Sequence, residues 1–516
     1  MITLRIPLMA FDYRFPTLST LAFLLAAPAA QAELTSAEVW SDWKTYMSDL
    51  GYDMTGIENT NAQGLTVEGM KITFDLPQGE GKFDIDMGTT QFIDQADGSV
   101  RIEMSETWRF GFNIAPVDAE TLTGQMLYTQ VGSDLVVSGD PTQLKYDFKA
   151  DSVEMKLDGL AVDGATIGPE IFAMTIAMSD AESTTDMTIG DTRNYSQTMK
   201  IAATSYNINA KDPESTGLIK MQGTVNSLEF AGDGVVPMVA NFNDVPNMLK
   251  AGFAFAGGYS FAGGSNAMTF DGPDGSGTMN TTSEGGTFDI NMSEAGLTYV
   301  TSANAFTVNA LMNEFPIPIS FEADRATFNF GMPMLKGDDP QDFAFGTSFE
   351  GFQMSDTIWG LFDPTGQLPR DPATVILDLT GKAKILFDFL DPAQAAVIEQ
   401  SGAVPGELNS VELANITVDA VGARLTGSGA FTFDNSDTQT FNGLPRPSGA
   451  VDFQLLGANG LIDKLTGMGL LPQEQAMGAR MMLGIFASPG EGEDSLVSKI
   501  EVNDQGHVLA NGQRLQ

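Results

Sequence analysis

The stretch "FDIDM", from Phe83 to Met87, places an apolar side chain at every second residue. Successive side chains of a β-strand point to opposite faces, so Phe83, Ile85 and Met87 share one face and the two aspartates share the other. Such a strand has one face for a core and one face for water. The stretch therefore predicts a one-sided strand in an antiparallel sheet.

The same period of two recurs along most of the chain. Examples are Ile72/Phe74/Leu76, Val100/Ile102/Met104, Leu144/Tyr146/Phe148, Val153/Met155/Leu157, Tyr206/Ile208/Ala210, Phe288/Ile290/Met292, Ile317/Ile319/Phe321, Ala326/Phe328/Phe330, Val375/Leu377/Leu379 and Val451/Phe453/Leu455. Turn signals such as Asp97-Gly98 and Asn442-Gly443 separate many of these segments. We therefore expect a mainly β fold, with a large antiparallel sheet that is curved or rolled, or with two packed sheets.

Few segments have helical spacing. Residues 35–50 carry apolar side chains at three- and four-residue steps, with Thr35 or Ser36 as the cap. The aromatic stripe of this N-terminal helix, which includes Trp40 and Trp43, is typical of core packing. The other predicted helices are short ones near 243–250, 355–362 and 393–400, and a C-terminal pair within 459–486.

The second helix of the C-terminal pair is rich in large, flexible apolar side chains. Methionine adapts its shape to irregular partners. Met477, Met481, Met482 and Phe486 are therefore candidate contacts for a hydrophobic ligand or a protein partner. The alternative is a core helix that caps the sheet.

Charge and composition exclude several function classes. The 516 residues include 26 Lys and Arg against 67 Asp and Glu, a formal net charge of −41. Nucleic acid and anionic lipid surfaces require clustered basic residues, so we expect neither partner. The acidity indicates a strongly solvated surface, or an acidic role in ligand binding. The absence of cysteine excludes disulfides, thiolate metal sites and cysteine nucleophiles.

The N-terminal segment has the features of a secretory signal. Arg5 and Arg14 precede a short apolar core, and Ala30-Gln31-Ala32 matches a cleavage site. We therefore expect residues 1–32 to be removed, and the mature chain to be periplasmic or secreted. No later stretch is long enough for a transmembrane helix. Residues 33–516 are expected to form a single large β-rich domain, with a sub-boundary near 240–265.

Motifs for catalysis and metal binding are weak. "GYSFA" around Ser260 lacks the strand-to-helix context of a nucleophile elbow, and His507 is the sole histidine. Asp271 and Asp274, in "DGPDGSG", could hold a cation, but the loop lacks full calcium-loop spacing, and a plain hairpin is the alternative. We therefore predict no enzymatic activity and no cofactor.

His507 belongs to a predicted terminal hairpin rather than to a catalytic group. Ile500 and Val502 lead into the turn Asn503-Asp504-Gln505-Gly506, and Val508 and Ala510 return from it. Asn511-Gly512 is expected to end that strand before the tail. The position beside a turn indicates a structural histidine.

Several stretches resemble known families. "RLTGSGAFTFDN" (Arg424–Asn435), "GLIDKLTGMGLLPQEQAMGARMMLGIFASPGEGEDSLVSKIEV" (Gly460–Val502) and "SAEVWSDWKTYMSDLGYDM" (Ser36–Met54) resemble an uncharacterised alphaproteobacterial family of exported proteins, domain of unknown function 2125. The resemblance extends over nearly all of residues 33–516. The order G-x-G-x-F-x-F, helix pair and final hairpin is also similar to the ends of AsmA-like envelope proteins. That similarity implies a long curved sheet with an apolar inner face, in proteins of envelope lipid homeostasis.

Three functions fit these observations. The first is a periplasmic protein that binds lipid or another hydrophobic ligand in a β-groove, because one-sided strands with few covering helices leave an apolar concavity. The second is a non-enzymatic structural or interaction protein of the envelope, with a closed β-sandwich core and an envelope protein partner. The third is a glycan or ester hydrolase, which would require two opposed acids across a cleft.

Overall fold

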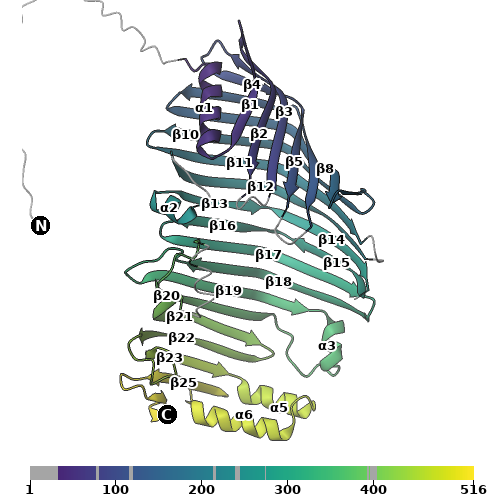
Figure 1. The fold of residues 1–516 in the computed structure, drawn as a ribbon. Coiled ribbons are helices and arrows are strands. Elements are labelled where there is room, and N and C mark those ends of the chain that lie inside the picture. Colours follow the sequence, from purple (N-terminus) through teal and green to yellow (C-terminus); the bar gives the residue numbers. More distant parts are fainter. Residues whose placement is uncertain are drawn as a thin grey trace, which may run out of the picture.

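A computed structural model describes residues 33–76, 81–115, 120–212, 217–238, 244–273, 275–391, 394 and 404–515. Within these residues, 27 strands form one continuous antiparallel sheet, and a few helices flank it (Figure 1). The expected mainly β fold is confirmed, as one curved sheet rather than two packed sheets. The predicted signal segment 1–32, Asp274 and most of the predicted helix at 393–400 lie outside the described residues.

The first part of the chain forms strands that range from three residues (β9) to 20 residues (β8) in length. They are β1 (Asp53–Asn61), β2 (Gly64–Asp75), β3 (Gly81–Asp94), β4 (Val100–Met104), β5 (Thr107–Ile114), β6 (Leu122–Val131), β7 (Asp134–Asp140), β8 (Gln143–Val162), β9 (Ala165–Ile167), β10 (Phe172–Ile189), β11 (Thr192–Lys211) and β12 (Leu218–Pro237). β8, β10, β11 and β12 lie side by side in chain order.

The sheet continues without interruption into the second part of the chain. Its strands are β13 (Ala254–Phe261), β14 (Gly263–Gly272), β15 (Gly275–Ser283), β16 (Gly285–Ser293), β17 (Gly296–Met312), β18 (Phe315–Met332), β19 (Gln341–Met354), β20 (Ala373–Ile385), β21 (Gly406–Ala420), β22 (Ala423–Asp434), β23 (Arg446–Leu456), β24 (Ser488–Pro489), β25 (Ser495–Val502), β26 (Val508–Ala510) and β27 (Gln513–Arg514). The predicted terminal hairpin is β25 and β26. Asn511-Gly512, however, turns the chain into β27 instead of ending the sheet.

The helices lie where the sequence predicts them. They are α1 (Ser36–Asp49), α2 (Val245–Lys250), α3 (Asp356–Phe362), α5 (Ala458–Gly467) and α6 (Gln473–Phe486). α1 begins with a capping box, because the Thr35 hydroxyl accepts from the Glu38 backbone N–H and the Glu38 carboxylate accepts from Thr35. No helix among the described residues has the length and apolar content needed to cross a membrane.

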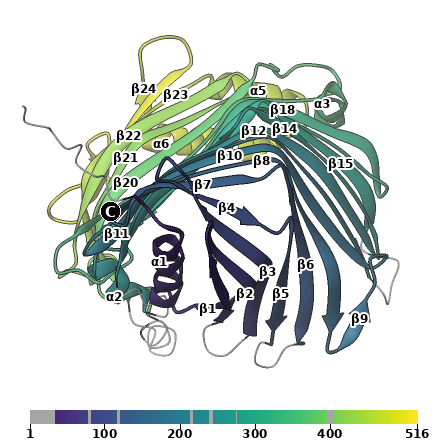
Figure 2. The same cartoon turned by 90° about the horizontal axis from the view of Figure 1, so that it is seen from above.

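The long strands bend at their middle, along a line that crosses the sheet. Asp180 in β10 and Ser227 in β12 have φ angles of 49° and 48°, and Ala305 in β17 has a φ of 42°. These residues, and Ala202 in β11 between the first two, fall out of the ladder pairing. The pairing keeps the same register on both sides of each gap, so the unpaired residues lie opposite one another, and the left-handed backbone interrupts the extended conformation there. The bends fold the sheet into an arch, which Figure 2 shows along the axis of the strand stack.

Each bend also changes which residues of a strand share a face. In β12, Met221 and Val225 lie on the same face as Leu228 and Phe230 beyond the bend at Ser227. The apolar face therefore stays on one side of the sheet although the alternation changes from odd to even numbers. Short strands continue the sheet on either side of the bend, because two of them pair with different parts of one longer strand. β4 and β5 both pair with β3, and β13 and β14 both pair with β12.

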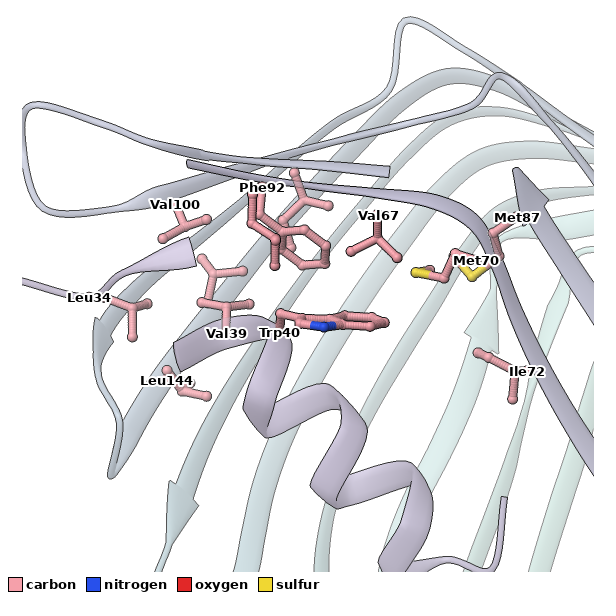
Figure 3. Close-up of a cluster of buried hydrophobic side chains, with 13 residues drawn as sticks. Leu34, Val39, Trp40, Val67, Met70, Ile72, Met87, Phe92, Val100 and Leu144 are labelled. Carbon is pink, nitrogen blue, oxygen red and sulfur yellow. The ribbon is translucent and has the colours of Figure 1, made fainter. Parts of the chain in front are cut away.

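The densest hydrophobic core lies between α1 and the strands around it (Figure 3). Trp40 and Trp43 of α1 contact Phe92 of β3, with ring centroids 5.7 and 5.3 Å apart. Val39, Val67, Met70, Val100 and Val137 complete the fully buried part of this cluster. The predicted core role of the aromatic stripe is thus confirmed for Trp40, and α1 is fixed on the concave side of the arch.

Candidate functional site: an uncovered apolar trough

The apolar face of the sheet forms the concave wall of the arch. α1 lies inside the arch, and its Trp43 contacts Phe92 and Tyr146 on that face. We call this concave face, from β8 to β25, the trough. Neighbouring strands lie about 4.8 Å apart, so the trough is roughly 60 Å long.

The trough is lined by uncharged side chains. One row of cross-strand partners runs through Met199, Phe230, Tyr259, Phe288, Thr301, Phe328, Thr347, Leu377, Ile416, Gly427, Phe453 and Ser498. Residues next to members of this row in the sequence, such as Glu229, Asp289 and Asp378, lie on the opposite, convex face of the sheet. Among the paired residues of β10 to β23, the single charge on the trough face is Arg193 of β11.

Aromatic rings form a continuous ladder along the trough. Each contacts the next across a strand boundary, with centroid distances of 4.9 to 6.5 Å. The members are Phe230, Tyr259, Phe288, Tyr299, Phe328 and Phe345. A second group near the bend joins Phe306, Phe349, Phe352 and Phe321.

Glycines on the trough face allow rings from neighbouring strands to lie close to the sheet. A Cβ added at Gly427 would lie 2.4 Å from a ring carbon of Phe453, and one at Gly381 would lie 2.4 Å from Phe343. A side chain at either position would push the ring away from the wall. The glycines therefore keep the aromatic lining flat and the space above it open.

Much of this lining is accessible to solvent. Tyr259 is 41% exposed, and Ile219 and Val375 are exposed to a similar extent. Buried large apolar side chains concentrate under α1, and those after residue 250 lie mostly at strand ends and in connections. Within the described part of the chain, the face from β13 to β23 thus has no second layer. An extended exposed apolar surface is typical of a binding site.

One end of the concave face is enclosed by α1. A cavity of about 450 Å³, which we call the chamber, lies between α1 and the sheet. Its wall includes Trp43, Met47, Met54, Ile72, Met87, Met104, Trp108, Tyr128, Tyr146 and Met187. Several polar side chains of its wall form hydrogen bonds within the protein. Trp43 Nε1 donates to the Tyr146 hydroxyl at 3.3 Å, and Gln130 Nε2 donates to the Ser105 carbonyl at 3.4 Å.

A buried ion pair holds α1 over the chamber. Arg193 of β11 donates to both carboxylate oxygens of Asp42 at 2.8 and 3.0 Å, and its side chain is 3% exposed. The guanidinium also lies 4.6 Å from the ring centroid of Tyr46. Burial, and secondarily the Asp42 charge, raise the pKa of Tyr146 to about 12, so this phenol stays neutral. Arg193, the single charge among the paired trough-face residues of β10 to β23, is therefore neutralised within the protein by Asp42.

Sequence comparison identifies the family. The profile of a family described as an uncharacterized protein conserved in bacteria, domain of unknown function 2125, matches residues 243–512, just over half of the chain. The chain belongs to this family. No curated protein and no solved structure matches the chain. The matched region contains the trough from β13 onward, whereas α1 and the chamber precede it.

In this member of the family, the predicted contact residues of α6 lie on an exposed face. Met477 and Met481 are 64% and 65% exposed, and Met482 and Phe486 are also accessible. Ala476 is the buried residue of the helix. α6 is therefore not a core helix, which was the alternative interpretation.

The weak motifs for catalysis do not come together. Ser260 lies within β13, and His507 follows the turn after β25, so many strands separate them in the sheet. Asp271 lies at the end of β14, and no cluster of metal-ligating side chains occurs among the described residues.

Sequence reasoning missed the chamber and the bends. Asp42 and Arg193 are far apart in sequence, and nothing in their local pattern links them. The bends did leave a signal, because the apolar alternation changes parity between Phe148 and Val153 and again between Phe321 and Ala326. Each change marks a bend within one strand, β8 or β18, rather than a boundary between two strands.

Proposed function

We propose that this protein binds lipids along the trough. The observation that carries this proposal is the uncharged, aromatic inner face that no second layer covers in the described residues. Exposed apolar surface costs about 25 cal/mol per Å², so an extended hydrocarbon ligand gains by covering it. The acyl chains of lipids supply the apolar surface that would cover such a trough.

The electrostatics of the trough favour a hydrocarbon chain, rather than a charged group, as the part of the ligand that enters it. Arg193 is already paired with Asp42, and the paired trough residues offer no further charge between β10 and β23. A charged group moved into this lining would lose its hydration without a partner. The headgroup of a bound lipid therefore belongs at the open side of the arch, in contact with water.

Export places the proposed activity in the cell envelope. If residues 1–32 act as a signal, the mature chain begins at Glu33 and operates in the periplasm, where lipids must be shielded from water in transit. Intact mass measurement of protein from the periplasmic fraction tests this part. We expect a chain that starts at Glu33, and a chain that retains residues 1–32 would contradict it.

Lipid content tests the binding itself. The protein should be purified without detergent, extracted with organic solvent and analysed by mass spectrometry for acyl lipids. We expect lipids at a reproducible ratio to protein. Protein that is folded, free of lipid and unable to take up lipid from vesicles would overturn the proposal.

A further inference from the structure

We propose that the chamber under α1 is a pocket for the methyl end of a single acyl chain, which sets the direction of the ligand in the trough. This inference rests on the proposed function and assigns one end of the binding site. The chamber volume of about 450 Å³ lies in the range of ligand sites, roughly 300–1,000 Å³. It is too small for a complete two-chain lipid.

The chamber wall selects hydrocarbon over a polar group. The polar atoms of Trp43, Gln130, Tyr128 and Tyr146 are engaged, since Tyr128 donates to Gln130 and Trp43 donates to Tyr146 at 3.3 Å each. The wall also contains the hydroxyl groups of Tyr46, Ser183 and Thr185, and the Asp42 carboxylate, which is paired with Arg193. A phosphate or carboxylate there would lose its hydration without a free cationic partner, because Arg193 is already paired with Asp42.

The wall also suits a chain of variable shape. Met47, Met54, Met87, Met104 and Met187 line the chamber, and methionine adapts to irregular apolar surfaces. Each methylene of a ligand that the chamber buries adds to the affinity, because its apolar surface leaves water. Because α1 closes one side of the chamber, a chain that enters from the trough ends there, and its headgroup lies toward β13 and beyond.

Photocrosslinking with two fatty acids tests this direction. One probe carries a diazirine at the methyl end, and the other carries it next to the carboxyl group. Each is bound to the full-length protein, irradiated, and mapped by peptide mass spectrometry. We expect the methyl-end probe to label chamber residues such as Met104 and Trp108, and the carboxyl-end probe to label residues outside the chamber.

A matched pair of variants supports the mapping. Met104→Trp fills the chamber, whereas Val300→Trp places the same side chain on the convex face of β17, outside the proposed binding site. We expect Met104→Trp to abolish chamber labelling and to weaken probe binding about tenfold, a change of about 1.4 kcal/mol. Val300→Trp should leave probe binding and chamber labelling unchanged. Thermal unfolding of both variants shows whether each is folded, and the wild-type mapping stands by itself if one is not.

The outcomes separate this inference from the proposed function. Labelling of the chamber by the carboxyl-end probe would reverse the direction and overturn the inference. Labelling confined to β13–β23 would also overturn it, while lipid binding in the trough would stand. If neither probe labels the folded protein at all, the proposed function fails together with the inference.

Discussion

Arg193 forms a buried ion pair that helps to fix the position of α1. Its guanidinium joins β11 to α1 through Asp42 and is almost completely buried. Removing one partner of a buried pair leaves an uncompensated charge, and the cost is typically about 3–5 kcal/mol. The pair therefore links the closed end of the trough to the stability of the sheet.

Substitution of Arg193 tests this role. Arg193→Met should lower the free energy of unfolding by about 3 kcal/mol, because Asp42 loses its buried partner. The control is Lys145→Met, which breaks the exposed pair with Asp147 and should lower the stability far less, because solvent screens that pair. Thermal unfolding compares the two variants, and equal losses of stability would contradict the account.

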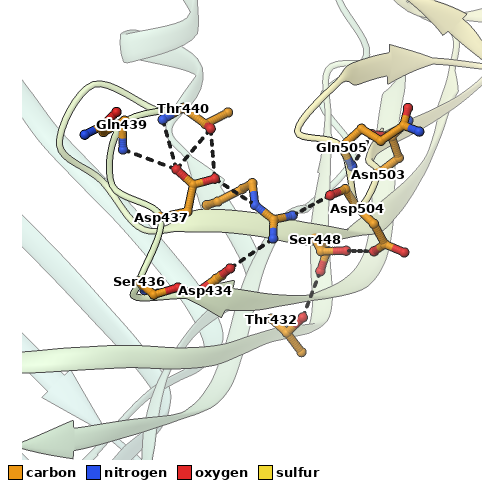
Figure 4. A network of polar contacts seen from close by, with 11 residues as sticks. Thr432, Asp434, Ser436, Asp437, Gln439, Thr440, Ser448, Asn503, Asp504 and Gln505 are labelled. Atoms are coloured by element: carbon orange, nitrogen blue, oxygen red, sulfur yellow. Dashed lines mark hydrogen bonds and ion pairs between the residues drawn. The ribbon is translucent and has the colours of Figure 1, made fainter.

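A second polar network fixes the C-terminal hairpin to the sheet (Figure 4). Arg446 donates to Asp434 and Asp437 at 3.0 Å each, and to the Asp504 carbonyl at 2.8 Å. Hydrogen bonds from Ser436, and then from Arg446, hold the pKa of Asp434 below its usual 3.8. Hydrogen bonds from Thr440 come first in lowering the pKa of Asp437, and the Arg446 charge adds to them.

The lowered pKa values predict a dependence on pH. A carboxylate whose pKa is depressed by folding contributes its stability fully above pH 3.8, and loses it as the pH falls through the folded value. Arg446→Gln should therefore lower the melting temperature at pH 7, and the difference from wild type should shrink below pH 3.8. Arg424→Gln, which alters a long and exposed pair with Asp419, is the control. A difference that persists at low pH would argue against the network.

Residue-level roles were only partly accessible from sequence. The stripe that includes Trp40 and Trp43 was correctly predicted to face a core, since helical spacing alone determines a shared face. The partners Tyr146 and Arg193 come from distant strands, and their meeting depends on the bends and the register of the whole sheet. Local spacing carries no information on such contacts.

At the scale of elements, the bend in the long strands gives the arch its shape. Asp180, Ser227 and Ala305 adopt left-handed backbone angles that are uncommon for residues with a side chain. The sheet pairing on both sides holds them there. The bends therefore help to curve the sheet, so that its apolar face forms the concave trough.

Glycine substitutions in β17 test the bend. Ala305→Gly removes the Cβ from a left-handed position, and we expect it to stabilise the fold by about 0.5–1 kcal/mol. Ala303→Gly, two residues away at an ordinary strand position, should destabilise by about the same amount. Chemical denaturation of both variants measures the difference. Two losses of equal size would show that Ala305 carries no strain.

Element types were predicted well, and element lengths were not. The helices at residues 36–49 and in the C-terminal pair follow from spacing and caps. The lengths of the long strands did not follow from the pattern, because a change of parity does not distinguish a bend within one strand from a turn between two strands. The exposure of the α6 methionines was likewise undecided, since helical amphipathicity does not say which surface the apolar face meets.

At the scale of the whole molecule, the composition follows from the architecture. A single sheet has a polar convex face and an apolar concave face, so the chain combines a net charge of −41 with apolar residues at 42%. The sequence predicted the alternation but left open whether two sheets close on each other. That choice depends on the direction of the bends, which place every apolar row on the same side of one continuous sheet.

The central claim is that the apolar concave face holds lipid. Tyr259→Asp and Val300→Asp test it directly, because the two side chains are 41% and 43% exposed but lie on the trough and the convex face, respectively. The measurement is the molar ratio of lipid to protein after detergent-free purification. We expect Val300→Asp to retain the wild-type ratio and Tyr259→Asp to lose most of its lipid. Equal lipid content in the two folded variants would contradict the account.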